Sequence, residues 1–198
     1  MKDIPGPVWL MQPIPYFGER LNGDWFVETK YDGWRLQILR YKDGRVELWG
    51  RRLEKKPNWT NKLRYLISFI EKMIPPATIL DAELCAAGGR RWIPSLFAKN
   101  RKSEPLVFIF DVIYFKGEFV GTLPLYERKR ILQTLVLHGP FRMATYKKLF
   151  DLAEELKQAL KRGEEGIVIK KADSPYIIGK EAPEATHYWR KIKGTLAV

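Results

Sequence analysis

The chain has 198 residues, enough for one well-buried domain or at most two small ones. Hydrophobic residues make up 45% of the chain and aromatic residues 13%, a composition that excludes a disordered tail. Lys and Arg number 35 against 23 Asp and Glu, so the formal net charge is +12. This excess favours a polyanionic partner, with nucleic acid ahead of an anionic membrane surface.

Cysteine content and the length of apolar runs indicate the compartment. Cys85 is the only cysteine, which excludes an internal disulfide and a zinc site built from a cysteine cluster. No apolar run reaches membrane-spanning length, and the N-terminus lacks the pattern of a signal peptide. The sequence therefore predicts a soluble, intracellular protein, cytoplasmic or nucleoid-associated.

The first quarter of the chain has two turn signals. Residues 1–24 hold four prolines and three glycines and are expected to form an irregular lead-in. Residues 25–31 and 34–41 are rich in aromatic and β-branched side chains, so Asp32-Gly33 between them predicts a β-hairpin. Asp43-Gly44 predicts a second hairpin, and an antiparallel meander follows.

The remaining elements alternate between helix and strand patterns. Apolar residues at helical spacing from Leu63 to Ile74 predict a helix, with Asn58 or Thr60 as its cap and Pro75-Pro76 as its end. Two amphipathic helices are expected at 125–136 and 149–160, and strands at 78–86, 106–115, 165–171 and 187–193. Hairpins with inserted helices predict an α+β domain of antiparallel sheets flanked by helices.

One charge interrupts the apolar strand at 106–115. Asp111 must be paired or bind a ligand, because an isolated buried carboxylate is costly. A hydrogen-bonded core aspartate fits the sequence equally well.

The segment from Glu28 to Arg35 carries the best candidate nucleophile. Lys30 is expected at a strand end, and Glu28 projects from the same face because side chains alternate along a strand. A lysine amine attacks only when desolvation or neighbouring positive charge favours its neutral form. Arg35 and the pair Lys191 and Lys193 could supply that charge. Taken alone, the segment also fits an exposed lysine on an ordinary Asp-Gly hairpin.

Five segments together resemble the motifs of covalent nucleotidyltransferases, and most closely the adenylation domain of ATP-dependent DNA ligases. They are Lys30-Tyr31-Asp32-Gly33-Trp34-Arg35, Leu80-Asp81-Ala82-Glu83, Phe108 to Tyr114, Glu165 to Lys170, and Trp189-Arg190-Lys191-Ile192-Lys193. The match covers nearly the whole chain in the correct order. It implies the nucleotidyltransferase fold of the DNA ligase and mRNA capping enzyme type, which is ATP-grasp-like.

The resemblance implies a role for each matching residue in binding the nucleotide. Lys30 would attack the α-phosphate of ATP, giving a lysine-AMP phosphoramidate. Glu28 would accept a hydrogen bond from the adenine amino group, Glu83 would hold ribose hydroxyls, and Phe110 would stack on the base.

Charged residues would handle the phosphates and the metal. Glu165 would help to hold Mg²⁺ or Mn²⁺. Because Glu165 and Lys170 are five positions apart, a regular strand would place them on opposite faces, so one of them is expected at the strand edge. Arg35 and Arg51 would contact sugar and phosphate, although Gly50 precedes Arg51 where the family has serine. Charge on the α-phosphate would be neutralised by Lys170, Lys191 and Lys193.

The implied function is nick sealing in DNA repair, replication or recombination. We expect one adenylation domain over residues 1–198, without a C-terminal oligonucleotide-binding (OB) barrel, because only five residues follow Lys193. The expected partner is a nicked duplex, DNA before RNA, with a homo-oligomer or an OB-fold partner in trans as further possibilities. An RNA ligase, a capping-type guanylyltransferase and a non-catalytic nucleic-acid-binding remnant stay open as alternatives.

Overall fold

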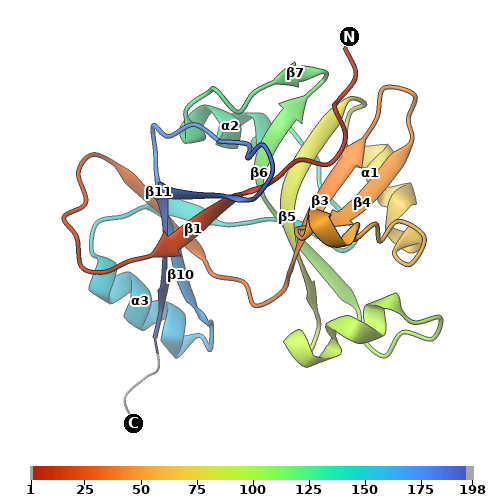
Figure 1. Ribbon diagram of the computed structural model, residues 1–198. Coiled ribbons are helices and arrows are strands. Elements are labelled where there is room, and N and C mark those ends of the chain that lie inside the picture. Colours follow the sequence, from red (N-terminus) through yellow and green to blue (C-terminus); the bar gives the residue numbers. More distant parts are fainter. Residues whose placement is uncertain (1, 195–198) are drawn as a thin grey trace.

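Two β-sheets form the body of the protein in the computed structural model, which describes residues 2–194 (Figure 1). The five-stranded sheet has the order β1 (Met11–Pro15), β11 (Glu184–Lys193), β10 (Gly166–Lys171), β2 (Trp25–Thr29) and β9 (Tyr146–Lys148). The six-stranded sheet has the order β4 (Val46–Gly50), β3 (Trp34–Arg40), β5 (Thr78–Ala86), β6 (Pro105–Phe115) and β7 (Glu118–Phe119), and β8 (Phe141–Met143) also pairs with β6.

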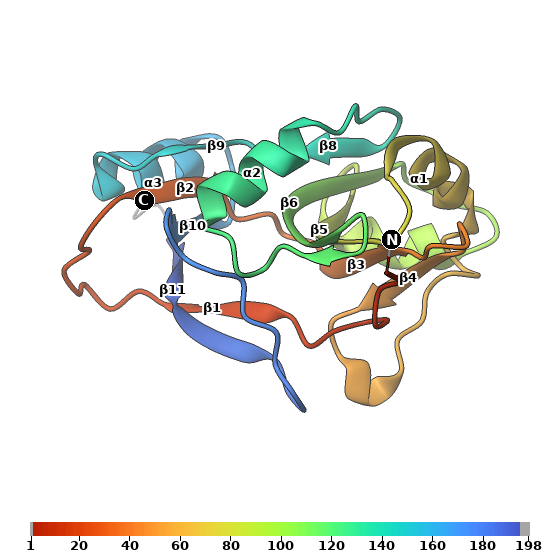
Figure 2. The same ribbon diagram turned by 90° about the horizontal axis from the view of Figure 1, so that it is seen from above.

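Short helices cover the sheets. The α-helices are α1 (Ile67–Met73), α2 (Leu125–Gln133) and α3 (Leu152–Lys161), and the 3-10 helices are η1 (Leu53–Lys55), η2 (Arg64–Leu66) and η3 (Arg90–Phe97). Figure 2 shows α2 and α3 along one side of the molecule, with η1 on the opposite side. No helix within residues 2–194 is long and apolar enough to cross a membrane.

The two faces of the six-stranded sheet have different partners. Leu80, Ala82 and Leu84 of β5 join the core that includes side chains of α1 and η3. Ile79, from the other face of β5, packs in a second core with Trp189 of β11. Because side chains alternate along β5, Asp81 and Glu83 also belong to the face that meets the five-stranded sheet. The candidate site lies between the sheets on this face.

The prediction of a hairpin at Asp32-Gly33 is wrong. β2 pairs with β9 and β10, whereas β3 pairs with β4 and β5, so the dipeptide connects the two sheets. Gly33 is needed for a close approach: a Cβ there would lie 2.5 Å from the carbonyl oxygen of Leu84. The dipeptide forms a bend at Gly33 and no hairpin, because both edges of β2 are occupied by strands that come much later in the chain.

The lead-in is also more ordered than predicted. Residues 11–15 form β1, which pairs in parallel with β11. β1 lies at the sheet edge, where Pro13 and Pro15 are tolerated because one side of the strand needs no hydrogen-bond donor. The parallel pairs β1–β11 and β6–β8 are additions to an otherwise antiparallel α+β fold.

Other expectations are confirmed or refined. The Asp43-Gly44 hairpin joins β3 to β4, with Gly44 at φ +91°. No side chain caps α1; instead Asn58 accepts a hydrogen bond from the Thr60 amide, and Thr60 accepts one from Leu48. Asp111 is a paired core aspartate, since Arg128 Nε and Nη2 lie 2.8 and 3.1 Å from its carboxylate oxygens.

Candidate functional site

A cavity of about 800 Å³ lies between the two sheets, and every site residue singled out in the sequence lines it. These residues are Glu28, Lys30, Arg35, Arg51, Glu83, Phe110, Glu165, Lys170, Lys191 and Lys193. They come from β2, β3, β5, β6, β10 and β11 and from the loops that follow or precede them. The fold therefore brings together residues that are up to 165 positions apart, from Glu28 to Lys193.

Lys30 lies on one wall of this cavity in a shared ion-pair network. Its amide donates to the Gly166 carbonyl at 3.0 Å, which anchors the residue just after β2. Its Nζ pairs with Glu165 Oε2, and Lys193 Nζ pairs with Glu165 Oε1. Burial alone would raise the pKa of Glu165, but hydrogen bonds from Lys193 and Lys30 outweigh it and lower that pKa. The Lys30 side chain is 19% exposed, so it is not in bulk water.

Glu165 reaches this wall because it precedes β10. The next residue, Gly166, has φ +149°, and a Cβ there would lie 2.1 Å from the Ile192 carbonyl oxygen. Only glycine permits this approach. The expected placement of Glu165 or Lys170 at a strand edge is thus confirmed, and both residues line one cavity.

The opposite end of the cavity is built around Glu28, which is 4% exposed. Lys170 Nζ lies 2.7 Å from Glu28 Oε2 and 4.4 Å from the centre of the Phe110 ring. Lys129 Nζ lies 2.6 Å from Glu28 Oε1. Burial lowers the pKa of Lys170 to about 8, although Glu28 opposes the shift. The contacts of Lys170 therefore lie with Glu28 and Phe110, whereas Lys193 contacts Glu165, the carboxylate that also pairs with Lys30.

Arg35 and Glu83 occupy neighbouring strands at the back of the cavity. Arg35 forms a two-pronged ion pair with Asp81 and donates to the Met11 carbonyl at 2.9 Å. Its guanidinium lies 4.7 Å from the centre of the Phe110 ring. Burial raises the pKa of Glu83 to about 7, against the lowering effect of Arg35. Arg35 is thus already neutralised by a protein carboxylate.

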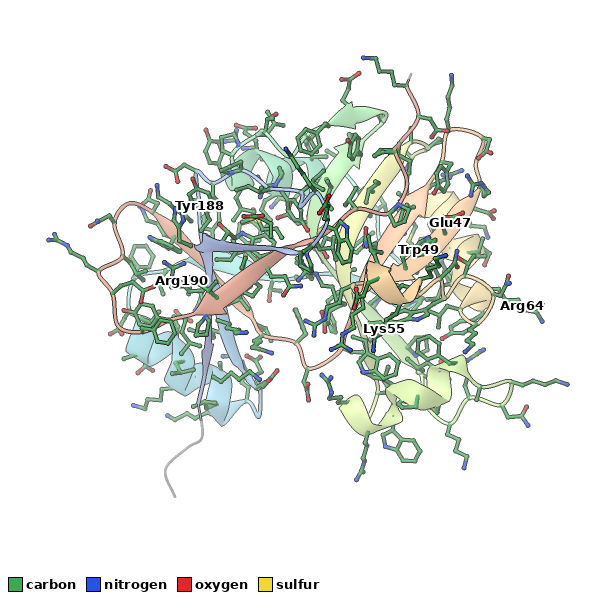
Figure 3. The ribbon with its side chains drawn as sticks, viewed as in Figure 1. Glu47, Trp49, Lys55, Arg64, Tyr188 and Arg190 are labelled. Atoms are coloured by element: carbon green, nitrogen blue, oxygen red, sulfur yellow. The ribbon has the colours of Figure 1, made fainter. Side chains whose placement is uncertain are left out.

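The residue before Arg51 is glycine because a larger side chain at position 50 would collide with Trp59. A Cβ on Gly50 would lie 2.5 Å from the indole ring of Trp59, so a serine would have to displace that ring. Further cations on this side of the cavity are Arg52, Lys55 and Arg90. Figure 3 shows Lys55 between the two sheets, with Arg190 of β11 on one side and Trp49 of β4 on the other.

Sequence reasoning missed several residues of the site. Val168 lines the cavity and is the register partner of Glu28, so its place on the motif strand could have signalled it. Trp34 and Trp59 line the outer wall, with ring centres 5.8 Å apart. The sequence around Lys129 gave no sign that this residue lies near the site, because its pattern indicates only an amphipathic helix.

Comparison with known proteins identifies the family of the chain. Residues 11–193 match the family model described as ATP dependent DNA ligase domain. The DNA ligase of Archaeoglobus fulgidus is 32% identical over 186 residues, covering 86% of this chain and 32% of that protein. The SPbeta prophage-derived DNA ligase-like protein LigB of Bacillus subtilis is 32% identical over 181 residues, covering 85% of this chain and 61% of that protein. The chain spans about a third of the first relative's length.

Solved structures share the fold. The ligase domain of M. tuberculosis LigD superposes with a TM-score of 0.68 at 21% identity, covering 93% of this chain and 59% of that one. The ATP-dependent DNA ligase from bacteriophage T7, in complex with ATP, gives a TM-score of 0.61 at 17% identity, covering 93% and 68%. The chain therefore belongs to the family of ATP-dependent DNA ligase domains and has their nucleotidyltransferase fold.

Proposed function

We propose that this domain transfers AMP from ATP to Lys30, then to a 5′-phosphate at a nick in duplex DNA, and completes the seal with the neighbouring 3′-hydroxyl. The observation that carries the proposal is the meeting of Lys30, Glu165 and Lys193 on one wall of a cavity whose far end holds Glu28 and Phe110. A cavity that holds a candidate nucleophile together with an aromatic ring and a carboxylate for the base suits a nucleoside triphosphate.

In the first step Lys30 Nζ attacks the α-phosphorus. A nitrogen–phosphorus bond forms, the bond between the α-phosphorus and the bridging oxygen breaks, and pyrophosphate leaves. An ammonium held by Glu165 is not a nucleophile, so the incoming nucleotide must loosen that ion pair and the amine must release a proton to water before it attacks. Lys191 and Lys193 lie on the same strand and would stabilise the negative charge of the reacting phosphate.

Magnesium fits this wall as a partly protein-bound ion. Glu165 offers carboxylate oxygens, which are the ligands that Mg²⁺ prefers, and within residues 2–194 no group of three or more acidic, His or Cys side chains forms a complete metal cage. Glu165 and the phosphates of the nucleotide would therefore hold the ion. When bound, it neutralises charge on the departing pyrophosphate.

The far end of the cavity would bind the nucleoside. Phe110 and Val168 offer apolar surface to the base, and stacking on an aromatic ring contributes roughly 1–3 kcal/mol per base. Glu28 would accept a hydrogen bond from the 6-amino group of adenine and would repel the carbonyl that guanine has there. Glu83 would hold the ribose hydroxyls. Because Lys170 contacts Glu28 and Phe110, we assign it to this end rather than to the α-phosphate.

Incubation with α-labelled ATP, magnesium and a nicked duplex tests the proposal. We expect the intact mass of the protein to rise by one adenylyl group and a denaturing gel to show joined strands. Lys30→Ala should abolish labelling completely, because no other amine would replace the nucleophile. A Lys30→Ala protein that still acquires label would refute the assignment of the nucleophile.

Competition and size measurements separate the alternatives. Unlabelled ATP should suppress labelling more strongly than GTP or NAD, whereas an RNA-capping enzyme would prefer GTP. Nicked DNA should be sealed faster than nicked RNA. Gel filtration with and without nicked DNA would detect a homo-oligomer, and adding an OB-fold protein would test assistance in trans.

A further inference from the structure

Two buried lysines contact the Glu28 carboxylate, and only one of them lines the cavity. Lys170, which is 3% exposed, lines the cavity, whereas Lys129, which is fully buried, does not. A bound nucleotide would therefore meet Glu28 and Lys170 directly, but it would not reach Lys129. Any effect of Lys129 on the nucleotide must pass through its protein contacts.

Those contacts are the two groups that face the base. Lys129 Nζ lies 2.6 Å from Glu28 Oε1 and donates to the Phe110 carbonyl at 2.8 Å. It also lies 4.8 Å from the centre of the Tyr146 ring. One ammonium on α2 thus connects the carboxylate on β2 with the backbone of the aromatic residue on β6.

The backbone of Lys129 on α2 is held in place by its neighbour in the chain. The preceding residue, Arg128, pairs with Asp111 and donates to the Ser174 carbonyl at 2.9 Å. Asp111 and Ser174 are both buried. α2 can therefore hold the Lys129 ammonium in one position relative to β6. Neither partner of the ammonium needs to move when a ligand enters.

One oxygen of the Glu28 carboxylate is held by Lys129 through charge alone. The contact of Lys129 with Oε1 is an ion pair outside hydrogen-bond geometry, and within the described residues no donor completes a hydrogen bond to this buried oxygen. A carboxylate oxygen accepts two hydrogen bonds. Because this oxygen is buried against Lys129, its position depends on that ammonium.

We propose that Lys129 is a positioning residue for base recognition: it fixes the Glu28 carboxylate and the Phe110 backbone relative to each other and thereby sets the preference for a 6-aminopurine. The inference rests on the proposed function and extends it to a residue that does not touch the nucleotide. Without Lys129, Lys170 alone would hold Glu28, and the carboxylate could turn away from the base edge.

Equilibrium binding tests this role without any chemistry. Calorimetry in EDTA compares ATP with purine riboside triphosphate, which differs from ATP only by lacking the 6-amino group. For the wild-type protein, one hydrogen bond to a charged group predicts a preference for ATP of about tenfold or more. Lys129→Met, which keeps an unbranched side chain one atom shorter and without the charge, should reduce this preference to about twofold or less. Arg130→Met, at the adjacent exposed position, should retain the wild-type ratio.

A double-mutant cycle separates positioning from general damage. In a Glu28→Gln background, Lys129→Met should leave the ratio unchanged, because the group through which Lys129 acts is already altered. The inference is overturned if Lys129→Met weakens both ligands equally at an unchanged ratio, or if it changes the ratio further in the Glu28→Gln background. Since both ligands are compared without magnesium, these outcomes do not depend on whether Lys30 becomes adenylated.

Discussion

At the scale of single residues, Glu83 makes stability depend on pH. Burial raises its folded pKa to about 7 from an ordinary value of 4.5. The folded state therefore binds this proton more tightly than the unfolded chain. The resulting stability is fully present below about pH 4.5 and is lost as the pH rises through about 7.

Glu83→Gln should remove this dependence, because glutamine does not titrate. Between pH 4.5 and pH 8, the free energy of unfolding of the wild type should fall by about 3 kcal/mol relative to the variant. Urea unfolding at intervals of one pH unit measures the difference, in which other titrating groups cancel. Glu54→Gln, at an exposed position, is the matched control. A difference that stays constant with pH would contradict a buried, titrating Glu83.

The sequence could predict which residues share the cavity, but it could not predict which side chains form ion pairs with them. Motif order was enough to bring Lys30, Glu165 and Lys193 to one cavity. Nothing in that order indicates that Arg35 pairs with Asp81, or that Lys129 reaches Glu28 from a helix. Such contacts depend on the three-dimensional approach of elements that local patterns describe one at a time.

At the scale of elements, the connection between β2 and β3 shows how a local turn signal can predict a wrong strand pairing. An Asp-Gly pair between two strand patterns favours a tight turn. It does not determine which strand edges are free, and β2 is enclosed by β9 and β10. The hairpin predicted from Asp43-Gly44 is confirmed, because the facing edges of β3 and β4 have no competing partner.

Substitutions at this connection distinguish packing from turn formation. Gly33→Ala should destabilise the protein by about 2 kcal/mol, because its Cβ would meet the backbone carbonyl of Leu84 at 2.5 Å. Asp32→Ala should cost less than about 0.5 kcal/mol, since its ion pair with Arg90 is exposed. Thermal unfolding of both variants provides the comparison. Equal losses would indicate a hairpin turn in which both residues matter.

At the scale of the whole molecule, the fold class followed from the sequence, but the pairing of the first strand with the last strand in the five-stranded sheet did not. Strand patterns joined by hairpin signals, with helices inserted between them, indicated an α+β domain of antiparallel sheets, as observed. The parallel pairing of β1 with β11 joins residues that are more than 170 positions apart, from Met11 to Glu184, and encloses the cavity. A short strand containing two prolines gives no local sign of such a partner.

The net charge of +12 favours a polyanionic partner, and the number of phosphates that Lys and Arg contact determines how duplex binding responds to salt. Each phosphate contact made by Lys or Arg contributes about 0.9 to the slope of log K against log salt concentration, through counterion release. We expect the double variant Arg52→Gln and Lys55→Gln, at the cavity mouth, to lower this slope by about 2 for a nicked duplex.

A second double variant, which removes the same charge elsewhere, separates direct phosphate contact from the general attraction of a positively charged protein for DNA. Lys157→Gln with Lys161→Gln removes the same charge from α3, on the other side of the five-stranded sheet from η1 (Figure 2). Fluorescence anisotropy from 50 to 200 mM salt should give this variant the wild-type slope, because counterions are released only where phosphates touch the protein. If the two double variants lower the slope equally, net charge alone governs binding and the cavity mouth is not the contact surface.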